Sequence, residues 1–163
     1  MEDYTKILEE ANKKIKLADH MYNMTYPVMK DKNLLIVTME NIFIAVTKSV
    51  TSLLLYERKF KNIPPFADNF DSKFELFKDI SKKHGFVGSD IELLQKVKDI
   101  MKHHNESQME FQKKEKIVFY GEDNKMISVS INDIKDILNK AKLFIDKVNF
   151  IFLKNESGNS RNN

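Results

Sequence analysis

Residues 34–56 read LLIVTMENIFIAVTKSVTSLLLY and form the most apolar stretch of the 163-residue chain. The stretch is long enough to span a bilayer, but Glu40, Asn41 and Lys48 lie in its interior. One ionised group at the centre of a membrane-spanning helix costs roughly 2.5–3.5 kcal/mol. We therefore predict no membrane segment, but a helix over residues 32–60, capped by Asp31. Apolar residues surround most of its circumference, so this helix is either the central element of a core or part of a dimer interface.

Further helices are predicted before and after this central helix in the sequence. Residues 3–24 repeat apolar side chains at three- and four-residue steps, and Pro27 is expected to stop that helix. A third helix is predicted to begin near Asp71 or Ser72. It ends at Gly85, a residue that suits a left-handed helix cap.

Two more helices carry capping signals. The fourth is predicted from Ser89, which forms a capping box with Glu92, to about residue 104. The last begins where Ser130 and Asp133 can satisfy each other's free amides. Its apolar residues then alternate four and three apart, which is typical of an amphipathic helix.

Short β-branched and aromatic runs at residues 116–120 and 126–130 flank the polar sequence Gly-Glu-Asp-Asn-Lys, which predicts a β-hairpin. The chain becomes polar at residue 155, so residues 155–163 are predicted to be a disordered tail. The predicted fold is therefore mainly all-α. It is an antiparallel helical bundle of about five helices, with one small β-hairpin before the last helix, in a single domain over residues 1–154.

The composition excludes several classes of function. The chain has no cysteine, so disulfide frameworks, thiolate metal sites and cysteine nucleophiles are excluded. This absence fits a reducing compartment, and we expect a cytoplasmic location. The net charge of +3 is spread along the chain and only two basic residues are arginine, so composition gives little support for a nucleic-acid partner. No cofactor and no metal site are expected.

The candidate for chemistry is Lys98-Asp99-Ile100-Met101-Lys102-His103-His104, at the end of the fourth predicted helix. A histidine with an ordinary pKa of about 6.5 can take a proton from a 2′-hydroxyl or give one to a leaving oxygen. A cation one helical turn away would stabilise charge on a phosphorane. The candidate catalytic residues are therefore Lys98, His103 and His104.

This segment, in a helical bundle and before the last helix, resembles the HEPN superfamily. Many members are metal-independent endoribonucleases marked by an arginine, four to six residues, and then a histidine. Lys98 stands at the arginine position, and His103 or His104 closes the motif. The resemblance extends over residues 31–152 as an order of elements. It implies a dimer that brings two such motifs together, although lysine lacks the planar fork of arginine.

Helix geometry separates the three side chains. His103 is turned about 140° from Lys98, and His104 about 240°. A joint site would require the helix to unwind near Met101 or a second monomer to supply a group. The plainer interpretation is a polar, solvated helix end whose cations suit the helix dipole.

Two other groupings need mention. A metal site formed by His103, His104, Glu106 and Glu110 is disfavoured, because adjacent helical histidines point about 100° apart. In the central helix, Glu40 and Lys48 are expected to form a buried pair that also involves Ser52. His20 and His84 are isolated in the sequence.

We therefore predict a HEPN-like helical module that acts through self-association and binding of a partner protein or RNA, without strong catalysis. The first alternative is a metal-independent endoribonuclease using His103 or His104 with Lys98. The second is a helical scaffold or interaction protein unrelated to HEPN proteins. A homodimer is expected, with its interface on the central or the last helix, where apolar residues exceed what one bundle face requires.

Overall fold

A computed structural model describes residues 3–60, 62–121 and 125–160. The central helix is α3 (Lys32–Lys59), and the Asp31 carboxylate accepts the Asn33 N–H at 2.9 Å as predicted. By length and composition α3 could cross a membrane, but 56% of its most apolar 18-residue window is buried inside the protein. Ile42, Val46, Val50 and Leu53 are 0–3% exposed, which confirms that α3 forms the core.

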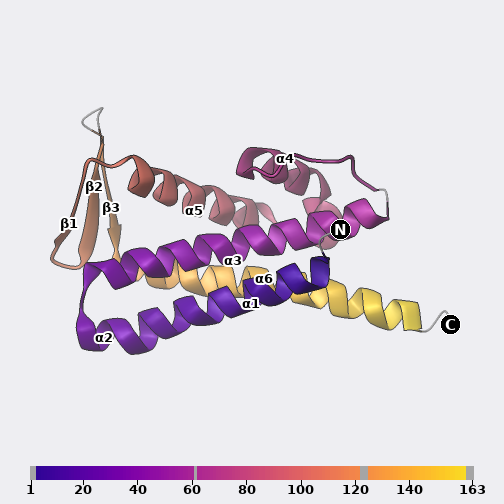
Figure 1. Cartoon of the computed structure of the whole chain (residues 1–163), viewed down its shortest axis with the longest axis horizontal. Helices are drawn as coiled ribbons and strands as arrows, with labels where there is room; N and C mark the ends of the chain where they lie inside the picture. The colour runs from indigo at the N-terminus through magenta and orange to yellow at the C-terminus, as the bar shows by residue number, and fades with distance from the viewer. Residues whose placement is uncertain (1–2, 61, 122–124, 161–163) are drawn as a thin grey trace.

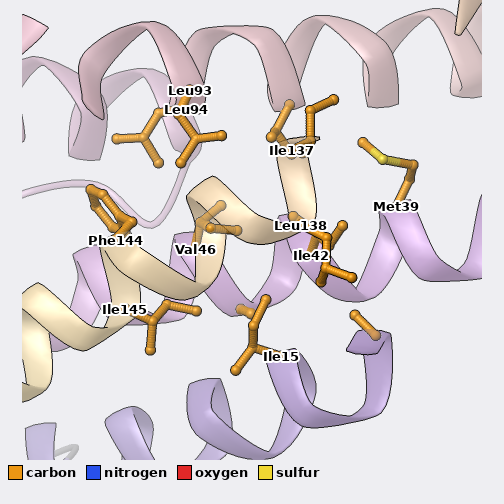
Figure 2. Packing of buried hydrophobic residues seen from close by; sticks show 14 of the residues in the cluster. Ile15, Met39, Ile42, Val46, Leu93, Leu94, Ile137, Leu138, Phe144 and Ile145 are labelled. Atoms are coloured by element: carbon orange, nitrogen blue, oxygen red, sulfur yellow. The ribbon is translucent and has the colours of Figure 1, made fainter. Parts of the chain in front are cut away.

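The first and the last helix both pack against α3 in the bundle (Figure 1). The first, α1 (Tyr4–His20), runs antiparallel to α3, and the Ser52 hydroxyl donates to the Tyr4 carbonyl between them at 2.6 Å. The last, α6 (Ile131–Ser160), runs parallel to α3, so that Phe152 reaches Tyr56. Figure 2 shows apolar side chains of α1, α3, α5 and α6 filling the space between these helices.

Pro27 does not stop the first helical segment, which corrects the prediction. The chain passes from α1 through a π-helical turn (Met21–Thr25) into a short helix, α2 (Tyr26–Met29). The helical segment ends at Lys30, whose φ is 51°. Proline lacks only its own N–H and is tolerated in the first turn of a helix. Pro27 occupies that position in α2, so helical structure continues past it.

The remaining helices cover the other side of α3. Helix α4 (Phe70–Ser81) is capped by Asn69, and a short 3₁₀ turn (Lys82–His84) leads to Gly85 with φ 81°, as expected of a left-handed cap. Helix α5 (Gly88–Glu106) begins one residue before the predicted start. The Asp90 carboxylate, and not the predicted Ser89–Glu92 box, closes this end by accepting the Val87 N–H at 2.9 Å.

The chain then forms a three-stranded antiparallel sheet rather than the predicted hairpin. Strands β2 (Lys116–Tyr120) and β3 (Met126–Ser130) were expected, and β1 (Met109–Lys113) adds a strand beside β2. The predicted turn between β2 and β3 includes residues 122–124, which lie outside the described residues. The sheet stands at one end of the bundle (Figure 1).

Helix α6 begins with the predicted capping box, in which Ser130 and Asp133 each accept the other's N–H at 2.9 Å. Its backbone stays helical through Ser160, beyond the predicted start of the tail at residue 155. Helical hydrogen bonds can extend past the last buried side chain, here Phe152, because propagation adds one bond per residue. The rest of the predicted tail, residues 161–163, lies outside the described residues.

Candidate functional site

The predicted catalytic residues point in three directions from one unbroken helix. Helix α5 shows no unwinding near Met101, which is buried. Lys98 forms an ion pair with Asp71 in the first turn of α4, and its ammonium lies 4.8 Å from the centre of the Phe70 ring. One chain therefore does not bring Lys98 and either histidine together.

His103 and Lys98 line different clefts. Lys98 borders a cleft of about 490 Å³ that is also lined by Phe43 of α3 and that adjoins the second cleft at Lys102. His103 borders a cleft of about 700 Å³ between α5 and the sheet, next to Phe119. The Nδ1–H of His103 donates to the Asp99 carbonyl at 2.7 Å, which leaves Nε2 as the acceptor nitrogen of the neutral ring.

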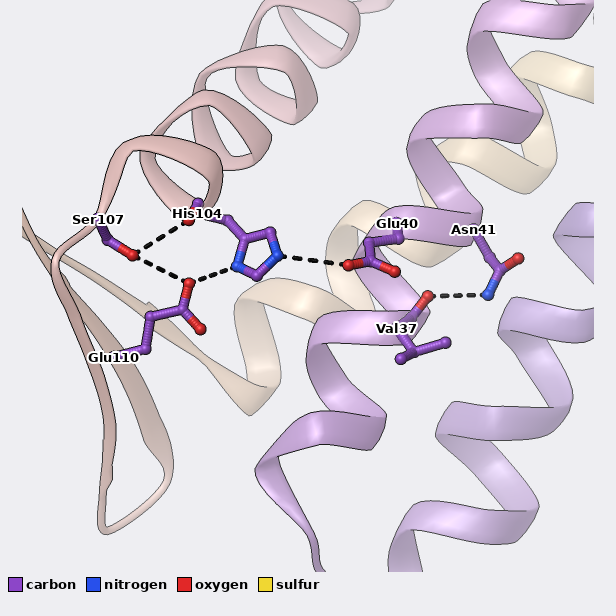
Figure 3. A network of polar contacts seen from close by, with 6 residues as sticks. All are labelled: Val37, Glu40, Asn41, His104, Ser107 and Glu110. Carbon is purple, nitrogen blue, oxygen red and sulfur yellow. Dashed lines mark hydrogen bonds and ion pairs between the residues drawn. The ribbon is translucent and has the colours of Figure 1, made fainter.

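His104 lies between two carboxylates, and together they join three elements (Figure 3). Its Nδ1 contacts Glu110 Oε1 of β1, and its Nε2 lies 3.3 Å from Glu40 Oε1 of α3. The Ser107 hydroxyl lies 3.0 Å from the same Glu110 oxygen, to which it can donate. The Lys32 ammonium donates to the Glu110 backbone carbonyl at 3.0 Å, so β1 is also tied to the start of α3.

This arrangement limits what His104 can do chemically. An ionised carboxylate only accepts hydrogen bonds, so both ring nitrogens can bond to these neighbours only if both carry a proton. An imidazolium has no lone pair with which to take a proton from a substrate. The cluster of Glu40, His104 and Glu110 links α3, α5 and β1. It is suited to fixing β1 against α3 more than to acting as a general base.

The same cluster shows why a metal site is not formed from it. Glu40 and Glu110 contact opposite edges of the imidazole ring, so their oxygens do not converge on one point (Figure 3). Among the residues that the structure describes, no group of three or more His, Cys, Asp or Glu side chains could hold a metal ion. Of the four residues considered from the sequence, only His104 and Glu110 contact each other.

The expected buried pair of Glu40 and Lys48 is not formed, which corrects that prediction. Lys48 instead pairs with Glu10 of α1 at 2.8 Å, and this hydrogen bond and charge hold the pKa of Glu10 below its ordinary value. Eight residues of helix separate Glu40 from Lys48 by about 12 Å along the axis, beyond the reach of an ion pair. Each side chain therefore finds its partner on a neighbouring element.

A second histidine cluster was not predicted, because His84 is isolated in the sequence. His84 Nε2 contacts Glu57 Oε1 near the end of α3, and the carboxylate also accepts from Asn62 at 2.8 Å and Lys83 at 3.1 Å. Burial raises the pKa of Glu57, but these three hydrogen bonds outweigh it and leave the pKa below its ordinary value. The sequence did offer one signal of this cluster. Glu57 is a glutamate in an apolar helix, and a buried charge requires hydrogen-bond donors nearby.

Comparison of the sequence with models of protein families found no match, and neither did comparison with curated proteins.

Proposed function

We propose that this chain is a HEPN-like helical module that associates with a second copy of itself and binds a further partner, without forming a catalytic centre in one chain. The observation that carries the proposal is an uncovered apolar strip on α6. Leu143, Phe150 and Leu153 are 63–65% exposed on the helix whose opposite face forms the core. Leu143 and Phe150 are seven residues apart, about two turns, so they share one face.

The strip is self-complementary. Two copies of α6 can lie antiparallel with Leu143 of one copy opposite Phe150 of the second copy. The same register sets the exposed Asp146 of each copy opposite Lys147 of the other, whose ammonium also pairs with Asp90 of its own chain at 2.8 Å. A two-fold interface of this kind uses the same surface on both subunits, as most homodimers do.

The arrangement at the end of α5 supports binding over catalysis. Lys98 is held by Asp71, and both ring nitrogens of His104 face carboxylates. Acid–base catalysis requires a group that can accept and release a proton within hydrogen-bond reach of the substrate. His104 has no ring nitrogen free to contact a substrate while it lies between Glu40 and Glu110.

Light scattering of the wild type and two variants tests self-association. The wild type should show twice the chain mass of 19.2 kDa, and Phe150→Glu should show a single chain mass because it introduces a charge into the strip. Val28→Glu is the matched control, since Val28 is an exposed apolar residue on α2, far along the chain from the strip. A wild type of 19.2 kDa at all concentrations, or dissociation of both variants alike, would refute the proposed dimer.

The endoribonuclease alternative is favoured by one observation. The bond from His103 to the Asp99 carbonyl orients the ring and selects the tautomer with Nε2 as acceptor, beside an open cleft. A second copy would have to supply the cation. Cleavage of single-stranded RNA in the presence of a chelator, lost in His103→Ala and kept in His20→Ala, would establish this alternative.

A further inference from the structure

The two faces of the small sheet differ in what covers them. Ile117, Phe119 and Val129 belong to the hydrophobic core, so their face is turned toward the helices. Side chains alternate along a strand, which places Val118 on the opposite, outer face. Val118 is 5% exposed without belonging to the core cluster, so its neighbours on the outer face cover it.

The outer face is apolar and partly aromatic. The strand register sets Phe111 beside Val118, and Met109 and Met126 on either side of Tyr120. Met109 and Met126 are 58% and 62% exposed, and Phe111 is 37% exposed. An exposed group of large apolar side chains on a sheet face is typical of a binding surface.

One end of this face is basic. Lys113 and Lys116 are directly opposed across β1 and β2, on the same side as Phe111 and Val118, and Lys114 lies in the turn between them. All three are exposed, and none of their ammonium groups is in an ion pair within the part of the chain that the structure describes. Glu115 in the same turn offsets one charge, so the turn stays positive.

The turn between β1 and β2 brings like charges together. Like charges directly opposed across two strands destabilise the pair. Lys114 has φ 56°, the positive φ that a two-residue turn between antiparallel strands favours. An anion bound between the lysines would remove the repulsion.

We infer that the outer face of the sheet binds single-stranded RNA, with a base stacked on Phe111 and phosphates held by Lys113, Lys114 and Lys116. A flat face that combines an aromatic ring, apolar side chains and adjacent cations matches the chemistry of unpaired bases on a charged backbone. Bases within a duplex are stacked on one another and do not offer their faces. This inference names the partner in the proposed function and does not require self-association.

The lysines also define how such binding should behave. Lysine holds phosphate as a point charge, without the bidentate geometry that arginine offers. Stacking accepts every base, so affinity should vary little with sequence. Three lysine–phosphate contacts on a single strand predict a slope of about −2 for log affinity against log salt. Affinity should then fall about 20-fold between 50 and 200 mM salt.

Fluorescence anisotropy with a labelled single-stranded 12-nucleotide RNA of mixed sequence tests the inference. Phe111→Ala should weaken binding about tenfold through lost stacking. Lys113→Gln with Lys116→Gln should weaken it and reduce the salt slope by about 1.4. The matched control, Lys13→Gln with Lys16→Gln, removes the same charge from exposed positions on α1 and should change affinity less than about twofold.

Three outcomes would overturn the inference: no binding by the wild type at 50 mM salt, equal binding by the sheet variants and the control, or equal affinity for duplex RNA. The mass of each variant, measured by light scattering, separates this inference from the proposed self-association. Phe150→Glu should become monomeric and still bind RNA. Phe111→Ala should stay dimeric and bind RNA about tenfold more weakly. If Phe111→Ala instead became monomeric with unchanged RNA binding, the outer face would be a contact between copies.

Discussion

Helix α3 carries two glutamate–histidine contacts, and the surroundings of the two contacts differ. Glu57 is 1% exposed and accepts hydrogen bonds from three side chains. Glu40, in the first third of α3, has a side chain that is 41% exposed, and it shares His104 with Glu110. In the first contact, the buried Glu57 carboxylate has several donors. In the second contact, the single His104 ring lies between two carboxylates. The supply of donors and the burial together indicate that Glu57 has a structural role and that Glu40 can be replaced at little cost.

Of the changes that test this comparison, replacing Glu57 should have the largest effect on the free energy of unfolding. Glu57→Ala leaves His84, whose side chain is 9% exposed, without its partner in the core. Removing one member of a buried charged pair is expected to lower the free energy of unfolding by about 3 kcal/mol. Urea denaturation measures this loss. A decrease below 1 kcal/mol would mean that the contact is not structural.

The pH dependence of the contribution of Glu57 to stability should be a smaller effect. The pKa of Glu57 is lower in the folded chain than its ordinary value of 4.5. Its contribution to stability is therefore complete above pH 4.5 and is lost as the pH falls through the lowered pKa. The difference in unfolding free energy between the wild type and Glu57→Gln should accordingly shrink below pH 4.5. A difference that stays constant from pH 7 to pH 3 would contradict the assigned cause.

Replacing Glu40 should have the smallest effect. In Glu40→Gln, His104 keeps its contact with Glu110, and the side chain at position 40 stays partly in water. We expect the free energy of unfolding to change by no more than about 0.5 kcal/mol, the range of exposed ion pairs. Urea denaturation of Glu40→Gln and Glu57→Ala under the same conditions measures both changes. An equal loss of unfolding free energy in the two variants would remove the distinction between the two contacts.

The sequence predicted those elements whose signals are local. The all-round apolar pattern of α3 located the core, and the reciprocal bonds of Ser130 and Asp133 located the start of α6. Strand β1 was missed because its apolar residues, Met109 and Phe111, lie on the exposed face, while Glu110 turns inward to His104. This alternation is the reverse of what a half-buried strand usually shows.

The candidate site was only partly predictable for a related reason. Helical spacing correctly indicated that Lys98, His103 and His104 would not share a face. The partners of His104 come from α3 and β1, and the first of them lies 64 residues away in the sequence. Similarly, nothing in the sequence near His84 indicates Glu57, because tertiary packing alone brings them together.

The parallel arrangement of α3 and α6 has a consequence for the order of folding. Helices α1 and α3 are joined by a short connection and can pair early, whereas contact of Tyr56 with Phe152 closes a loop of most of the chain. Loop-closure entropy opposes such distant contacts until other structure shortens the loop. In stopped-flow kinetics, we expect Ile15→Val in α1 to slow folding and Ile145→Val in α6 mainly to speed unfolding. The last helix would then be the last element to join the core and the first to leave it.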